Sequence, residues 1–168
     1  MIKLVVKYIF VFIFIVLIQT LILNNIQFSG LINPYPYILF ILILPFETPR
    51  WVLLSLAFLI GISIDAFSYT LGMHAAASVL IAYMRPSVLK LIAPRDGYEV
   101  NSSPSLHFYG LSWFFKYTVI LTLIHHFVLF YLEISRFSDF FITFSRVMIS
   151  AFFSIFLIII SQYLFFRR

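Results

Sequence analysis

Asp65 is the residue of this sequence whose position most clearly suggests chemistry. It ends the run Gly61-Ile-Ser-Ile-Asp65, inside an apolar stretch from 51 to 67. A carboxylate within a stretch that can cross a membrane is costly unless it is paired, so Asp65 is a candidate for binding or switching. His74, beyond the next turn, and Arg146, at the start of the last apolar stretch, are its potential partners. The structural alternative is that Asp65 pairs two helices or caps the turn.

Small residues surround this carboxylate. Gly61, Asp65 and Ser68 share one helical face, which lets another helix approach closely at Gly61. Gly72 and Ala76 follow at small-xxx-small spacing, typical of close helix packing in membranes. We therefore expect these positions to form a packing surface, within the chain or against a partner helix.

No group of residues in the sequence has the types and spacing of an enzyme active site. The sequence has no cysteine, and its four histidines lack the spacing of a metal site; His125 and His126 point to different helix faces. Ser63 lies in half of a nucleophile elbow, which leaves an intramembrane serine hydrolase as a minor alternative, although such a serine usually bonds back to its own helix. We expect no catalytic residue, no cofactor and no metal.

The composition places these residues in a membrane protein. Of 168 residues, 63% are hydrophobic and 10% are charged, and the mean hydropathy is +1.09. Soluble domains are roughly half apolar and a quarter charged. The net charge is +5, but the basic residues do not cluster, so a nucleic-acid partner is not expected.

The elements that must position Asp65 are therefore membrane helices. The sequence predicts a single all-α domain over 1–168, with spans at 4–23, 51–67, 71–89, 113–132 and 147–166. A shorter apolar segment lies between Asn33-Pro-Tyr-Pro-Tyr37 and Pro45, and it either crosses or re-enters. The polar stretch 94–112 is expected to be a cytoplasmic loop, whose aromatic residues suit the headgroup region.

Charge counting favours six spans with both termini in the cytoplasm. If the short segment crosses, Arg136 and Arg146 are the two basic residues outside, and nine lie inside: Lys3, Lys7, Arg50, Arg85, Lys90, Arg95, Lys116, Arg167 and Arg168. If it does not cross, four basic residues lie inside and seven outside. The positive-inside rule selects the first arrangement.

Several of these motifs together resemble a known family. Gly61-x-x-x-Asp65, Leu71-Gly72-x-x-Ala75 and Ala82-Tyr83, preceded by Asn33-Pro-Tyr-Pro-Tyr37 and Pro45-Phe-Glu-Thr-Pro-Arg-Trp51, resemble the rod shape-determining protein MreD family. The resemblance covers about residues 33–90 and does not extend to the loop 94–112.

The resemblance implies a non-enzymatic, multi-pass subunit of the bacterial inner membrane. Such a subunit binds MreC and, through it, works with MreB, RodA and the partner transpeptidase of RodA in peptidoglycan synthesis and cell shape. We place the expected partner interface, or functional polar site, at Gly61, Asp65, Gly72, His74, Ala76 and Arg146. The family is also similar in fold to the substrate-binding subunits of energy-coupling-factor transporters. That likeness gives the alternative function, a membrane subunit that binds a small molecule near Asp65, His74 and Arg146.

Overall fold

The computed structural model describes residues 2–25, 33–99, 102–134 and 140–165. Within these residues the chain is all-helical, which confirms the predicted class. Its six α-helices are α1 (Ile2–Leu17), α2 (Leu39–Leu42), α3 (Arg50–Ser68), α4 (Met73–Leu91), α5 (Leu106–Ile134) and α6 (Phe140–Phe165). Four helical stretches are long and apolar enough to cross a membrane: Lys3–Asn25, Arg50–Ser68, Leu106–Ile134 and Phe140–Leu164.

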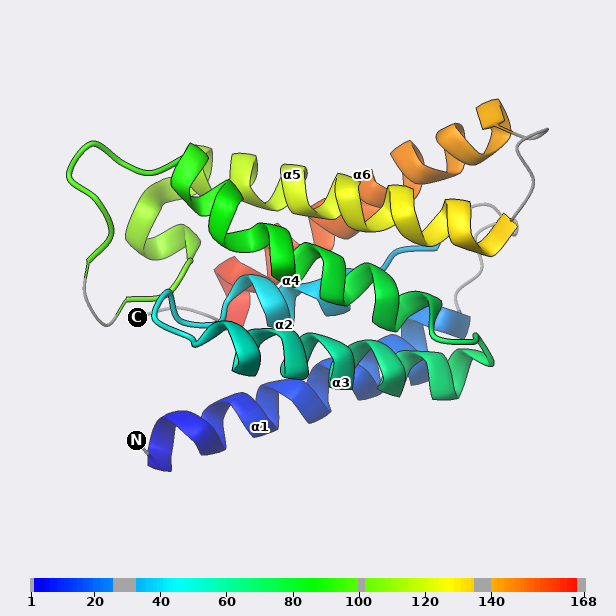
Figure 1. Cartoon of the computed structure of the whole chain (residues 1–168), viewed down its shortest axis with the longest axis horizontal. Helices are drawn as coiled ribbons and strands as arrows, with labels where there is room; N and C mark the ends of the chain where they lie inside the picture. Colours follow the sequence, from blue (N-terminus) through cyan, green and yellow to red (C-terminus); the bar gives the residue numbers. More distant parts are fainter. Residues whose placement is uncertain (1, 26–32, 100–101, 135–139, 166–168) are drawn as a thin grey trace.

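The long helices run side by side between two ends of the bundle (Figure 1). We call the end at which α1 begins the near end, and the end at which it finishes the far end. The helices α3 and α5 run from the near end to the far end, and α4 and α6 return, so that the described chain begins and finishes toward the near end. The closest neighbours are α3 with α4, α4 with α5, and α5 with α6.

The second pass is not a spanning helix. A 3-10 turn of three residues (Pro36–Ile38) leads into α2, which has four; at 1.5 Å per residue they cover roughly 10 Å of a ~30 Å hydrocarbon layer. Residues 33–35 cover further distance without helical structure, entering from the far end (Figure 1). Pro36 disfavours helical geometry at Tyr35, whose φ is −120° and ψ is 64°, so the helical part starts no earlier than Pro36, and Pro45 follows its end.

This short segment nevertheless lies at the centre of the bundle. Every residue from Tyr37 to Leu44 is buried. The non-helical backbone before it is satisfied by α6, because Ser150 Oγ accepts from Asn33 N at 3.1 Å and Ser154 Oγ accepts from Tyr35 N at 2.8 Å. Irregular backbone at membrane depth is tolerated when protein groups satisfy it in this way. The segment from Tyr37 to Leu44, which contains α2, therefore forms the centre of the core and does not face lipid.

Three of the predicted boundaries were wrong. The fourth span starts at Met73 rather than 71, and it is not apolar enough to join the four candidate spans. The fifth helix starts at Leu106, with non-helical geometry at Gly110, so the loop expected over 94–112 is shorter. The sixth starts at Phe140 rather than 147, because the polar residues Ser145 and Arg146 do not interrupt it. Its expected last residue, Phe166, and three of the counted cations (Arg136, Arg167, Arg168) lie outside the described residues.

The near-end loop is held by packed aromatic rings rather than spread over a headgroup layer. The Tyr98 ring stacks on the Phe46 ring at a centroid distance of 4.3 Å. The rings of Tyr109 and Trp113 each contact both of these rings in a T-shaped arrangement. Burial raises the pKa of Tyr98 to about 12, so its phenol stays protonated and donates to Leu89 O at 2.6 Å. This cluster joins the loop to the near ends of α4 and α5.

Candidate functional site

Asp65 caps the turn between α3 and α4. The side chain is 2% exposed, and its two oxygens accept from four groups. Oδ1 accepts from Thr70 Oγ1, from His74 N at 3.1 Å and from His74 Nδ1 at 3.0 Å, and Oδ2 accepts from Ala75 N at 2.9 Å. The first turn of a helix has free N–H groups and a positive dipole end, which a carboxylate satisfies. The expected pairing with His74 and the structural alternative of turn capping are both confirmed.

We predict that Asp65→Asn destabilises the fold. An asparagine has one acceptor oxygen and turns an NH2 group toward one of the backbone or side-chain donors, so at least one charge-assisted bond becomes a repulsive contact. The expected loss of unfolding free energy is about 1.5–3 kcal/mol, measured by SDS titration of the purified protein in detergent micelles. Asp96→Asn, the same change at an exposed loop position, should leave the midpoint unchanged; equal midpoints for both variants would contradict the capping role.

The small residues around Asp65 do not form one exposed interface. Gly61 is buried against α4, and a Cβ built there would lie 2.4 Å from Ala75 Cα. Gly72 precedes α4 as its N-cap, with a left-handed φ of 80°, so it is not on the expected helical face with Ala76. Ala76 is exposed. Gly72→Leu is thus unsuitable as an interface probe, since any side chain at that φ strains the turn.

Arg146 is not a partner of Asp65. It lies in the second turn of α6, where its Nη2 is 3.7 Å from Glu133 Oε2 on α5 and its guanidinium lies over the Phe130 ring at 5.0 Å. Of the two potential partners of Asp65, the structure therefore selects His74 and not Arg146. The reason is that His74, nine residues from Asp65 across a tight turn, already occupies the carboxylate.

A buried polar core, which the sequence analysis did not find, lies beneath the Asp65 turn. The Tyr37 hydroxyl is 2.6 Å from His125 Nε2 and 3.2 Å from Ser78 Oγ. His126 Nδ1 donates to Thr122 O at 3.0 Å, and its Nε2 lies 2.9 Å from Ser154 Oγ. The two histidines do point in different directions, but both directions are inside the bundle. Buried polar groups that are mutually bonded fix a unique packing of helices.

Arg85 is a second feature that the sequence analysis placed wrongly. It was counted among the cations facing the cytoplasm, yet it is 1% exposed and is among the largest fully buried side chains of the described chain. Its Nε donates to Tyr117 Oη at 2.8 Å, its Nη2 donates to Leu44 O, and the Tyr117 hydroxyl donates to Leu42 O at 3.1 Å. The guanidinium thus binds Leu44 O directly and Leu42 O through the Tyr117 hydroxyl, just beyond the C-terminal end of α2, where a cation is favoured.

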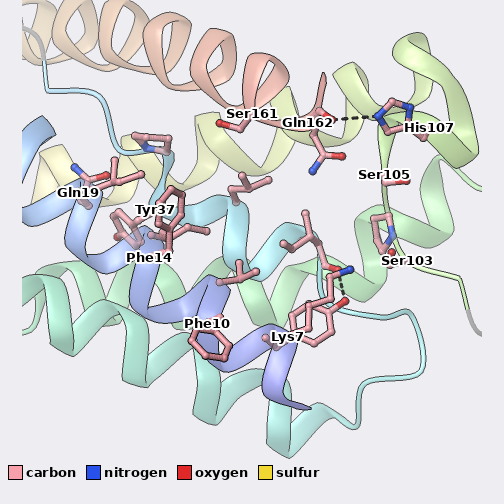
Figure 2. Close-up of a pocket in the computed structure, with 18 of the residues that line it drawn as sticks. Lys7, Phe10, Phe14, Gln19, Tyr37, Ser103, Ser105, His107, Ser161 and Gln162 are labelled. Atoms are coloured by element: carbon pink, nitrogen blue, oxygen red, sulfur yellow. Dashed lines mark hydrogen bonds between the residues drawn. The ribbon is translucent and has the colours of Figure 1, made fainter. Parts of the chain in front are cut away.

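A groove of about 800 Å³ opens along α1, next to α6 and the start of α5 (Figure 2). Its floor is the α2 segment, and its walls are mainly apolar. Polar groups gather toward the near end, where His107 Nε2 donates to Gln162 O at 3.2 Å. On α1 and its continuation the lining runs from Lys7 to Leu23, and Figure 2 labels Lys7 and Gln19 along it. The near-end polar lining also includes Ser103, Ser105 and Ser161.

A second pocket, of about 310 Å³, lies at the far end and is lined mostly by polar side chains. Tyr35 and His74 are among them, together with Thr70 of the turn and Glu133 of α5. The region near Asp65 and His74, where a ligand was expected, therefore contains a cavity. Arg146 does not line this cavity; it contacts Glu133, which does.

The remaining sequence expectations concern chemistry. Ser63 donates to Leu59 O at 2.7 Å on an exposed part of α3, as expected for a serine that bonds back to its helix. Among the described residues no group of three or more histidine, aspartate or glutamate side chains is placed to hold a metal ion. Comparisons with protein-family models, curated proteins and solved structures find no match for this chain.

Proposed function

We propose that this protein is a non-enzymatic scaffold subunit of the bacterial cell-elongation complex, which binds the transmembrane helix of MreC in the groove along α1. Through MreC it would join MreB, RodA and the partner transpeptidase in the inner membrane. The proposal rests on the sequence resemblance to MreD and on one structural observation, the lateral groove. The Gly61 and Asp65 motifs take a different role in this proposal, because they hold α3 to α4 inside the chain.

The dimensions of the groove suit lateral docking of a helix. From Lys7 to Leu23 its wall follows the chain for about 24 Å at 1.5 Å per residue. We propose that the groove receives one face of a helix and leaves the other face in lipid.

The orientation in the membrane follows from charge. Among the described residues, exposed cations gather toward the near end, while the Arg146 guanidinium at the far end is paired with Glu133. The positive-inside rule then favours a cytoplasmic near end. The near-end cations are Lys3, Lys7, Arg50, Lys90 and Arg95.

We predict that Ile15→Trp prevents MreC from co-purifying with the protein. Ile15 is a half-buried lining residue of the groove, and an indole there would occupy space that the partner helix needs. Ile13→Trp, two residues away on an exposed part of α1 outside the groove, is the matched control and should retain MreC. The measurement is a pull-down of tagged protein at native level in mild detergent, followed by mass spectrometry.

The same pull-down tests the function itself. Recovery of MreC, RodA and the transpeptidase with the unchanged protein supports the scaffold. Recovery of paired ATPases and a coupling membrane subunit would instead support the transporter alternative. Retention of MreC by the Ile15 variant as well as by the Ile13 variant would move the interface away from the groove.

A further inference from the structure

The near-end mouth of the groove along α1 carries a cation and hydroxyl groups. Lys7 lines it from α1, and Ser103 and Ser105 line it from the segment before α5 (Figure 2). Ser105 Oγ accepts from Phe108 N at 3.3 Å, which leaves its O–H as a donor. No aspartate or glutamate is among the described residues that line the groove. The mouth therefore favours an anionic group.

Lys7 forms no ion pair within the described part of the chain. The two ion pairs there join His74 to Asp65 and Arg146 to Glu133, and both lie toward the far end. Lys7 is exposed, and its long side chain can cover apolar surface while its ammonium group reaches the head groups of the membrane. An ammonium group at this depth attracts the phosphates of anionic lipid.

The rest of the groove suits an acyl chain. Every residue that lines the α1 wall from Phe10 to Ile18 is apolar, and the floor is the buried α2 segment. From Lys7 to Ile18 this wall is about 16 Å long at 1.5 Å per residue. One leaflet contributes about 15 Å to the ~30 Å hydrocarbon layer. A chain whose head group sits at the mouth therefore meets apolar wall over the depth of its leaflet.

The charge of the mouth distinguishes between phospholipid head groups. Phosphatidylethanolamine and phosphatidylcholine carry an ammonium group beside their phosphate, and the described lining offers no carboxylate to pair with it. Phosphatidylglycerol carries the negative charge of the phosphate without a cation. A charged ammonium donor and neutral hydroxyl donors match such a head group.

We propose that, in the subunit without its partner helix, this groove binds one anionic phospholipid. Lys7 pairs with the phosphate, the hydroxyls of Ser103 and Ser105 donate to its oxygens, and an acyl chain lies along α1 over the α2 segment. The partner helix would displace this lipid. The site therefore goes beyond the scaffold function and does not depend on it.

The test measures which lipid stays with the protein. The full chain, released without MreC from nanodiscs of equal parts phosphatidylethanolamine, phosphatidylcholine and phosphatidylglycerol, is examined by native mass spectrometry. We expect one phosphatidylglycerol to be retained in preference to the other two lipids. Equal retention of the three lipids, or retention of none, would overturn the proposal.

A matched pair of lysine variants tests the head-group contact. Lys7→Gln removes the charge, and glutamine forms helices about as well as lysine, so α1 is retained. We expect the retention of phosphatidylglycerol to fall about fivefold. Lys3→Gln makes the same change one turn earlier, at an exposed position that does not line the groove, and should leave retention unchanged. Equal effects of the two variants would indicate general attraction to the surface and would overturn the site.

A second pair tests whether the acyl chain lies in the groove. Ile15→Trp fills part of the groove and should lower lipid retention, whereas Ile13→Trp, on an exposed part of α1 outside it, should not. Full retention by the Ile15 variant would place the lipid elsewhere and overturn the proposal. Because MreC is absent from these samples, a failure here does not alter the outcome of the pull-down, and failure of the pull-down does not alter the lipid result.

Discussion

Arg85→Ala should unfold this protein under conditions in which the unchanged chain is stable. The substitution leaves Leu44 O without its donor, removes one of the two partners of the Tyr117 hydroxyl, and opens a cavity where one of the largest buried side chains was packed. Because Leu44 ends the segment that forms the centre of the core, the loss is not confined to one helix. We expect a decrease of about 4 kcal/mol or more in the free energy of unfolding.

The measurement is SDS titration with tryptophan fluorescence, since the Trp113 ring stacks on the Tyr117 ring at 5.3 Å and reports this region. Lys90→Ala, an exposed position on the same helix, should change the midpoint by less than about 0.5 kcal/mol. Arg85→Lys should fall between the two, because an ammonium keeps the charge but lacks the planar fork that reaches two acceptors. A variant Arg85→Ala as stable as Lys90→Ala would show that the guanidinium is not what holds the α2 segment.

Gly61→Ala should be the most damaging single-methyl change in the helix α3. A Cβ there would lie 2.4 Å from Ala75 Cα and 2.7 Å from Ala75 N. Those are backbone atoms, which cannot rotate away, so α3 and α4 must separate. Separation also lengthens the bonds from Asp65 to the first turn of α4. We expect a loss of about 3 kcal/mol.

The same unfolding titration can test whether Gly61→Ala clashes with backbone atoms or with a side chain of α4. The double variant Gly61→Ala with Ala75→Gly should be no more stable than the single Gly61 variant, because the methyl of Ala75 is not what blocks the space. Ala66→Leu, on an exposed part of α3, should be nearly neutral. Rescue by Ala75→Gly would mean that the two helices meet through side chains and that the close backbone approach is wrong.

The contacts that could be predicted from the sequence are those between near neighbours in the chain. Asp65 and His74 are joined by a short turn. The turn keeps the carboxylate at the end of one helix close to the histidine at the start of the next. Ser63 bonds to its own helix and needs no knowledge of the fold. Hydropathy likewise predicts the long helices, because each span must by itself contain enough apolar residues to cross the hydrocarbon layer.

What could not be predicted depends on which helices become neighbours. Tyr37 and His125 form a hydrogen bond although they are 88 positions apart in the sequence. Helical periodicity predicts which face of a helix is buried, but it does not predict which residue of another helix packs against that face. Arg85 was counted as a surface cation because a charge count contains no information on depth. Gly72 fits both a small-residue helix face and a left-handed cap, and the sequence pattern is the same for both.

The way in which residues 33–35 are held has a consequence for how the protein is made. Their backbone N–H groups bond to Ser150 and Ser154, which lie 117 and 119 positions later and are synthesised last. A helix satisfies its own backbone as it enters the bilayer, but this segment cannot. It must stay hydrated or sheltered by the insertion machinery until α6 arrives, so the second pass is completed after the sixth. We therefore expect this segment to reach its final position only after α6 has been inserted.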